Sequence, residues 1–292
     1  MGKIVSESIN KILLFSKQRS CWISKDQMVM TETLYGIEIL RVLASLSFLL
    51  ASSWYDYKFR EVSNRMWMLF APIGFTLTFI QYYLEYAAGK ALSIFLYWAV
   101  SLGFTAGISL FLFYAGFFGG ADAKALICLS ITIPVYPKFS LARFNVMLPL
   151  FPLAVLVNAV LASSMLVLVI LCHNLIRYAQ LKEEMFKGLE HEPRWRKILV
   201  FMTGIKVDLE KLKSGSHYIP LEYLVKEKNG EITRHLKVSP QLEEKIPKGL
   251  EEINGQIWAT PGLPFLIFLS IGFIIALFFG DFAGWLLDLM LP

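Results

Sequence analysis

The sequence Gly119-Gly120-Ala121-Asp122-Ala123-Lys124 places an aspartate between two strongly apolar runs. An aspartate at membrane depth is costly and usually faces a cavity or a partner, so it marks a functional site by default. Its small neighbours allow another helix or an extended backbone to approach closely. A purely structural acid would need a fixed cation, and Lys124, two positions away, points to another side of a helix. The stretch therefore favours a functional role for Asp122.

The composition is that of a membrane protein with several helices. Of the 292 residues, 56% are hydrophobic and 17% are charged. Soluble domains average roughly 45–50% apolar residues and about 25% charged residues. The basic residues behind the net charge of +5 lie beside apolar runs and are mixed with acids. That pattern suits membrane orientation and argues against nucleic-acid binding. The three cysteines form no CxxC pair, so neither a disulfide framework nor a zinc site is indicated, and we expect no metal and no cofactor.

Hydropathy predicts an all-α polytopic membrane protein with six transmembrane helices. Residues 1–33 form a polar, basic N-terminal tail, in which Met28 and Met30 are alternative starts to Met1. Residues 34–173 hold the first five helices. The fourth is so short that, at about 1.5 Å per residue, it barely crosses a bilayer, which places Asp122 near a membrane face. The predicted spans are residues 35–55, 66–83, 92–118, 123–135, 146–172 and 263–287.

A polar, charge-mixed segment interrupts this pattern over residues 174–257. Its length predicts a small cytoplasmic α/β insert between helices five and six, and residues 258–292 then hold the sixth helix. Residues 218–237 predict a β-hairpin, because two β-prone runs flank Asn229-Gly230, the strongest two-residue turn signal.

Charge predicts the orientation of the helices. With six spans, the loops after the first, third and fifth share one side of the membrane. That side carries the insert, with 15 Lys and Arg against 13 Asp and Glu, together with the loop residues Lys58, Arg60 and Arg65. The opposite loops hold Lys90, Lys138 and Arg143. The positive-inside rule therefore places the richer side in the cytoplasm, although the basic tail opposes this unless translation begins at Met28 or Met30.

Asp56, at the end of the first span, falls on the same face as Asp122. Two carboxylates that share a site cannot both ionise easily, so one keeps a proton while the other is a base. One acid can then activate water while the other protonates the scissile carbonyl oxygen of a peptide bond. Taken alone, Asp56 also fits an ordinary juxtamembrane acid, and Lys58 and Arg60 fit orientation signals or contacts with anionic lipid or substrate.

Other polar residues indicate less. His191-Glu192 begins a metalloprotease-like string, but Trp195 stands where HExxH requires its second histidine. Glu38 and Arg41 share one face near the end of the first span, where they can pair with each other or reach the headgroups. The four histidines are dispersed in the sequence and fit interfacial or surface positions: His173, His191, His217 and His235.

Two motifs together resemble those of a known family. Asp56-x-Lys58-x-Arg60-x-Val62-x-Asn64 and residues 119–124 resemble the active-site motifs of the GxGD aspartic proteases of the type IV prepilin peptidase group, and most of all its archaeal preflagellin (prearchaellin) peptidase branch. The likeness runs from about Thr33 to Pro292. Ala121 stands where GxGD has its second glycine, a position at which archaeal members accept other residues.

The resemblance implies a six-helix aspartic endopeptidase in the cell membrane with its active site facing the cytoplasm. Such enzymes remove the short basic leader, or class III signal peptide, from preflagellins or prepilins. Asp56 and Asp122 match the catalytic pair, and the motif residues that accompany the second acid are Gly119, Gly120, Ala121 and Lys124. The zinc segment of the bacterial enzymes and a methyltransferase motif are missing, so we expect cleavage without N-methylation.

Two alternatives stay open at this point. A proton-coupled membrane transporter could use Asp122 as a relay, although the sequence shows no internal repeat with a matching acid. A catalytically inactive scaffold could use the insert to recruit partners. The sequence leaves open whether the substrates are flagellins, pilins or both, and it leaves the oligomeric state open.

Overall fold

A computed structural model describes residues 2–140, 148–181, 185–208, 210, 212, 218–226, 232–237, 255–262 and 264–290, with side chains from residue 28 onward. The chain divides into two compact units. The first comprises Met1–Val157 and Phe273–Pro292, and the second comprises Asn158–Gly272. Each unit is described by itself.

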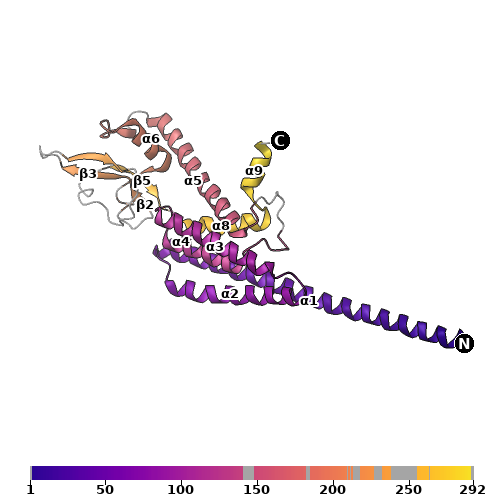
Figure 1. Cartoon of the computed structure of the whole chain (residues 1–292). Coiled ribbons are helices and arrows are strands. Elements are labelled where there is room, and N and C mark those ends of the chain that lie inside the picture. Colours follow the sequence, from indigo (N-terminus) through magenta and orange to yellow (C-terminus); the bar gives the residue numbers. More distant parts are fainter. Residues whose placement is uncertain are drawn as a thin grey trace. The chain divides into compact units, whose positions relative to one another are not determined.

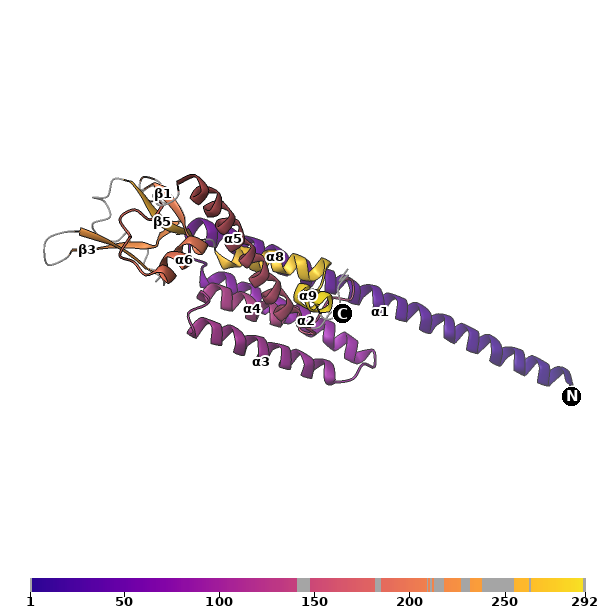
Figure 2. The ribbon, with the colours of Figure 1, turned by 90° about the horizontal axis from the view of Figure 1, so that it is seen from above.

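The first unit is built around a helical bundle (Figures 1 and 2). The C-terminal half of α1 (Gly2–Phe59) packs against α2 (Asn64–Ala87), and α4 (Gly120–Thr132) contacts both of them and α3 (Ser93–Tyr114). The unit also contains the first turns of α5 (Phe151–Leu181), the end of α8 (Phe265–Phe278) and all of α9 (Phe282–Met290).

Four helices in the described part of the chain are long and apolar enough to cross a membrane: Met28–Phe59, Asn64–Ala87, Ser93–Tyr114 and Phe151–Gln180. By contrast, α4 has 13 residues and α8 has 14, which gives each a length of about 20 Å against a hydrocarbon core of about 30 Å. Six crossings therefore remain a prediction.

The predicted sixth span is not one continuous helix. Where the sequence indicated a single helix over residues 263–287, the structure has α8 and α9 with a break at residues 279–281. Gly280 has a φ of 90° in this break, a conformation that glycine adopts without steric cost. Hydropathy runs on through the break because the flanking residues are apolar on both sides, so it could not reveal the interruption.

The short helix α4 is held at its C-terminal end by side chains of its neighbours. A helix leaves its last carbonyl groups without backbone partners, and in a membrane these groups must be satisfied within the protein. Trp98 donates to the Ile131 carbonyl at 3.0 Å, Ser101 to that of Pro134 at 3.0 Å, and Arg41 Nε and Thr78 Oγ1 to that of Thr132 at 2.7 and 2.9 Å. The end of α4 is therefore tied to α1, α2 and α3.

The second unit contains the strands. A three-stranded antiparallel sheet has the order β1-β5-β2, formed by Ile205–Asp208, Gln256–Pro261 and Tyr218–Pro220. A separate antiparallel pair, β3 (Glu222–Lys226) and β4 (Ile232–Leu236), confirms the predicted hairpin strands, with Glu222 opposite Leu236. The predicted Asn229-Gly230 turn lies outside the described residues.

Two details of this unit differ from the sequence prediction. The segment Tyr218–Pro220, which we assigned to the hairpin, pairs with β5 instead. β5 itself continues to Pro261, beyond residue 257, where we placed the end of the insert. A buried strand and the start of a membrane helix are both apolar, so composition alone did not separate them.

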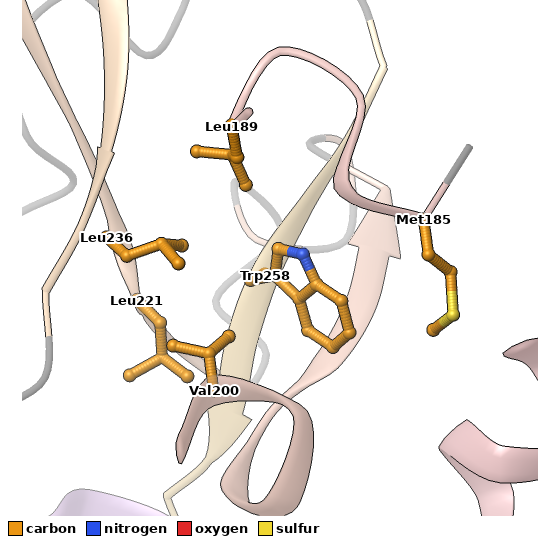
Figure 3. Close-up of a cluster of buried hydrophobic side chains, with 6 residues drawn as sticks. All are labelled: Met185, Leu189, Val200, Leu221, Leu236 and Trp258. Atoms are coloured by element: carbon orange, nitrogen blue, oxygen red, sulfur yellow. The ribbon is translucent and has the colours of Figure 1, made fainter. Parts of the chain in front are cut away.

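Trp258 on β5 lies at the centre of the core of this unit (Figure 3). Its indole is fully buried and stacks on Phe186 with ring centroids 5.1 Å apart. Burying each large apolar side chain contributes about 1.5–3 kcal/mol, so this cluster is a main source of stability for the insert. The other buried members are Met185, Leu189, Val200, Leu221 and Leu236.

Candidate active site

Asp122 occupies the first turn of α4, where its side chain caps the helix. Its Oδ2 accepts a hydrogen bond from the backbone N–H of Gly119 at 3.0 Å, and a carboxylate at this end also interacts favourably with the helix dipole. The residue is 7% exposed. Its Oδ1 is buried and has no hydrogen-bond partner among the described residues. One oxygen therefore fixes the side chain, and the other is available for water or substrate.

Asp56 lies in the last turn of α1 and is half-buried. Its backbone carbonyl accepts a hydrogen bond from Arg60 N–H at 2.9 Å, and Arg60 ends the helix with a φ of 57°. The charge of the Asp56 carboxyl group acts on Asp122, so the two side chains are near enough for electrostatic coupling. The structure thus brings together the two acids that the sequence singled out.

A third helix end lies at the same place. Lys124, in the first turn of α4, donates a hydrogen bond from Nζ to Oδ1 of Asn64 at 2.6 Å, and Asn64 is the first residue of α2. The end of α1 and the starts of α2 and α4 therefore gather around the two aspartates. This contact joins residues 60 positions apart, so it could not be predicted from the spacing of the motif.

The small residues before Asp122 differ in what they do. A Cβ added to Gly119 would lie 3.1 Å from Oδ2 of Asp122, a close approach that would press on the carboxylate. A Cβ on Gly120 would meet Phe113 at 3.6 Å, an ordinary contact. Ala121 is half-buried. Of the two glycines, Gly119 is therefore the one whose missing side chain leaves the catalytic candidate undisturbed.

The two basic residues after Asp56 lie at the rim of this region. Lys58 is exposed, with its Nζ 5.2 Å from the centroid of the Phe59 ring, and Arg60 is half-buried. Both are placed where a lipid headgroup or an approaching chain could reach them.

A second group of polar residues lines a cavity of about 190 Å³ in the first unit. Arg41 donates to Gln81 at 2.6 Å and lies over the Tyr82 ring, while Glu85 pairs with Lys90 at 2.9 Å and Lys138 at 2.8 Å. Arg41 lies fifteen positions before Asp56 on α1, about 22 Å along the helix axis. This network therefore joins helices at a distance from the two aspartates.

In the second unit, His191, Glu192 and His235 lie together, with candidate metal-binding atoms within 4.8 Å of one another. His191 and His235, which are far apart in the sequence, come together here, with ring centroids 4.7 Å apart. Protein donors contact both oxygens of Glu192: Oε1 accepts from Leu236 N–H at 3.1 Å, and Oε2 accepts from Arg196 at 3.2 Å.

The same contacts set the pKa of this acid. Burial alone would raise the pKa of Glu192, but hydrogen bonds from the Leu236 N–H, His235 and Arg196 outweigh it and hold the pKa below its usual value. A carboxylate already bonded in this way, with a guanidinium beside it, is better suited to structure than to metal binding. The cluster joins α6 (Arg194–Thr203) to β4.

Comparison with known proteins now identifies the class. The model of the "Type IV leader peptidase family" matches residues 43–172, which include both Asp56 and Asp122. A second model, "Archaeal Peptidase A24 C-terminus Type II", matches residues 196–282. The chain is therefore similar to the type IV leader peptidase family over these two segments, and the matches support a protease.

Two curated relatives are similar over most of their length. A preflagellin peptidase of Methanocaldococcus jannaschii is 27% identical over 249 residues, which cover 80% of this chain and 91% of the relative. A preflagellin peptidase of Methanococcus voltae is 27% identical over 251 residues, covering 84% and 95%. Both comparisons favour a protease over the transporter alternative.

Proposed function

We propose that this chain is a membrane aspartic endopeptidase that removes the basic leader of preflagellins or prepilins at the cytoplasmic face, with Asp56 and Asp122 as its catalytic pair. The family and the printed names of the relatives support leader cleavage. The observation that carries the choice of residues is the buried Oδ1 of Asp122, which has no hydrogen-bond partner among the described residues, at a helix end within electrostatic reach of Asp56 on another helix.

The proposed chemistry uses one shared proton. Because coupled carboxyl groups do not both ionise easily, one of them is protonated and the other is a carboxylate. The carboxylate takes a proton from water, whose oxygen attacks the scissile carbonyl carbon. The protonated acid meanwhile donates its proton to the carbonyl oxygen. The tetrahedral intermediate then breaks at the C–N bond, and the leaving amine receives a proton from the acid formed in the first step. The other aspartate, now a carboxylate, takes a hydroxyl proton from the intermediate as the carbonyl of the product forms, so the pair again holds one proton.

The proposed topology has six crossings, with the fifth and sixth flanking a cytoplasmic insert. Residues 1–33 precede the bundle, residues 34–173 hold helices one to five, the insert runs from about residue 174 to the end of β5 at Pro261, and α8 and α9 form the last crossing. The short α4 and α8 would cross with help from their flanking residues. Basic residues beside Asp56 support a cytoplasmic active site, since positive loops are retained on that side.

Lys58 and Arg60 are proposed to contact anionic lipid or substrate beside the catalytic pair. The exposure of Lys58 and the position of Arg60 at the end of α1 support this role. The leader of the proposed substrates is itself basic, so contact with lipid phosphates is electrostatically favoured over contact with the leader.

The test is processing of a leader-bearing preflagellin and a prepilin in membranes that contain the full chain. Asp56→Asn and Asp122→Asn preserve the size of each side chain but remove its acid–base function. Each should reduce cleavage to the background of membranes without enzyme. The matched control is Glu61→Gln, an exposed acid five residues after Asp56, which should cleave as the wild type does.

Two results would count against the proposal. Normal cleavage by either asparagine variant would remove that aspartate from the mechanism. Loss of cleavage in Glu61→Gln as well would show that any charge change near this helix end disturbs the protein. Gel filtration of each variant in detergent distinguishes loss of chemistry from loss of the fold.

A further inference from the structure

The amphipathic helix α6 presents apolar side chains to the surroundings of the second unit. Trp195, Ile198, Leu199 and Met202 are 54%, 58%, 39% and 36% exposed. At about 3.6 residues per turn, these four positions fall within an arc of about 100° on the helix surface. They form one continuous stripe, which we call the α6 stripe. Scattered exposed apolar residues are common on proteins, but a continuous stripe indicates an interaction surface.

The position of α6 is fixed by a membrane-crossing helix. Asn174 of α5 is fully buried, and its Nδ2 donates to the carbonyls of Phe201 at 2.7 Å and Gly204 at 2.6 Å, at the C-terminal end of α6. Asn174 lies within the candidate span Phe151–Gln180, six residues before its end, about 9 Å along the axis. The headgroup region on each side of a bilayer is of similar thickness. The attachment therefore holds α6 at the depth where a bilayer meets water.

The surface around this attachment is apolar. A cavity of about 380 Å³ between α5 and α6 is lined by Leu171, Leu175, Tyr178, Phe201 and others, with Lys197 as its one charged lining residue. On α5, Leu175 and Ile176 are 52% and 63% exposed. The exposed apolar surface of the spanning helix thus continues onto α6.

The charges of α6 favour contact with an anionic surface. The helix contains three basic residues and no acidic residue. Arg194, at its start, is exposed beside the α6 stripe. Basic residues that flank an apolar stripe are typical of helices that lie in the interface of membranes with anionic lipids.

We propose that α6 lies in the interfacial zone of the bilayer, with the α6 stripe against lipid chains and Arg194 at the level of the lipid phosphates. The occupant of this surface is anionic lipid. Docking of α6 would hold the insert against the membrane through a contact separate from the transmembrane helices. This proposal depends on α5 crossing the membrane and does not depend on the cleavage chemistry.

The experiment uses the full chain in vesicles of phosphatidylcholine, with and without phosphatidylglycerol. The three native cysteines are replaced by serine, and an environment-sensitive fluorophore is attached at Ile198→Cys. The matched control carries the same fluorophore at Asp208→Cys, an exposed position on β1 of the same unit. Nitroxides on the lipid and iodide in the buffer are the two quenchers.

We expect the probe at 198 to be quenched severalfold more by lipid nitroxide than by iodide, and the probe at 208 to show the reverse. Arg194→Glu should weaken the lipid quenching at 198 in phosphatidylglycerol vesicles. Equal iodide quenching at both positions would overturn the proposal, because the stripe would then face water. Protection of position 198 from both quenchers would also overturn it, because protein would then cover the stripe.

A measurement on the unmodified chain covers the case in which the cysteine replacements prevent folding. Photoactivatable phosphatidylglycerol is incorporated into the same vesicles, and the labelled peptides are identified by mass spectrometry. Labelling of Trp195 or Met202 supports the proposal. Labelling confined to the long apolar helices, with none on α6, refutes it.

Discussion

Gly74 lies where α2 and α4 approach each other most closely, and its replacement by alanine is a sharp test of the bundle. A Cβ at this position would overlap with Oγ1 of Thr132, well inside the 3.0 Å within which real Cβ atoms essentially never come to another heavy atom. Thr132 is fully buried, and its hydroxyl is bonded to the Cys128 carbonyl at 2.9 Å. Gly74→Ala therefore forces the helices apart by about 1 Å or drives Thr132 out of its rotamer.

The loss in the free energy of unfolding can be bounded from known effects of overpacking. Inserting one methyl group into a tightly packed interior typically costs about 1–3 kcal/mol, and we expect Gly74→Ala to fall in this range. Thr132→Ala removes the obstructing Oγ1, at a cost of about 1 kcal/mol for the lost hydrogen bond. In the double variant the two changes should compensate, with a coupling energy of about 1–2 kcal/mol.

The measurement is equilibrium unfolding of the four proteins of this double-mutant cycle in mixed micelles, with leader cleavage as a second readout. Gly103→Ala is the matched control, because an added Cβ on this α3 glycine meets nothing within 4 Å. Gly74→Ala should lose stability and cleavage together, and Thr132→Ala should restore both in part. Unchanged stability of Gly74→Ala, or additive effects in the double variant, would refute the close packing of α2 on α4.

Three further predictions concern single side chains. Gly119→Ala should lower cleavage at least severalfold with little change in stability, because its Cβ displaces the Asp122 carboxylate; kcat and a melting curve measured together check this. Arg41→Met should destabilise the bundle by about 1–3 kcal/mol, since it removes a buried charged donor from the Thr132 carbonyl, which keeps the Thr78 hydroxyl as a side-chain donor; unfolding in mixed micelles checks this. Glu192→Gln should destabilise the insert at neutral pH. The pKa of Glu192 is lowered in the folded protein. Its carboxylate therefore contributes fully to the free energy of unfolding above the unfolded pKa of about 4.3, and this contribution is lost as the pH falls through the folded pKa. The difference in stability between Glu192→Gln and the wild type should therefore shrink in acid.

Local patterns predicted local structure well. The paired strands around residues 227–231 followed from alternation and turn residues, and the helical bundle followed from long apolar runs. The pairing of Ile205–Asp208 with Gln256–Pro261 could not be predicted in this way. It joins segments about 50 residues apart, and no turn sequence links them.

Asp122 was singled out from the sequence because it stands among small and apolar residues, where a charge is conspicuous, and Asp56 because it falls at a span end on the same predicted face. The partners of Arg41 could not be predicted in this way. Arg41 was expected to pair with Glu38 on its own helix or to reach the headgroups, but the structure places it on the Thr132 carbonyl. Arg41 satisfies the carbonyl group at the end of the short helix α4, 91 positions later in the chain. The sequence around Arg41 does not indicate that this carbonyl needs a donor.

The hydrogen bonds that hold the C-terminal end of α4 bear on which of the two aspartates can move. Side chains of three other helices donate hydrogen bonds to carbonyl groups at this end, and at the opposite end the Asp122 side chain accepts one from the backbone of Gly119. Asp56 sits instead in a terminal turn, four residues before the backbone reversal at Arg60. In the proposed mechanism we therefore expect the end of α1 to adjust the distance between the two carboxyl groups when a substrate enters, while α4 stays in place.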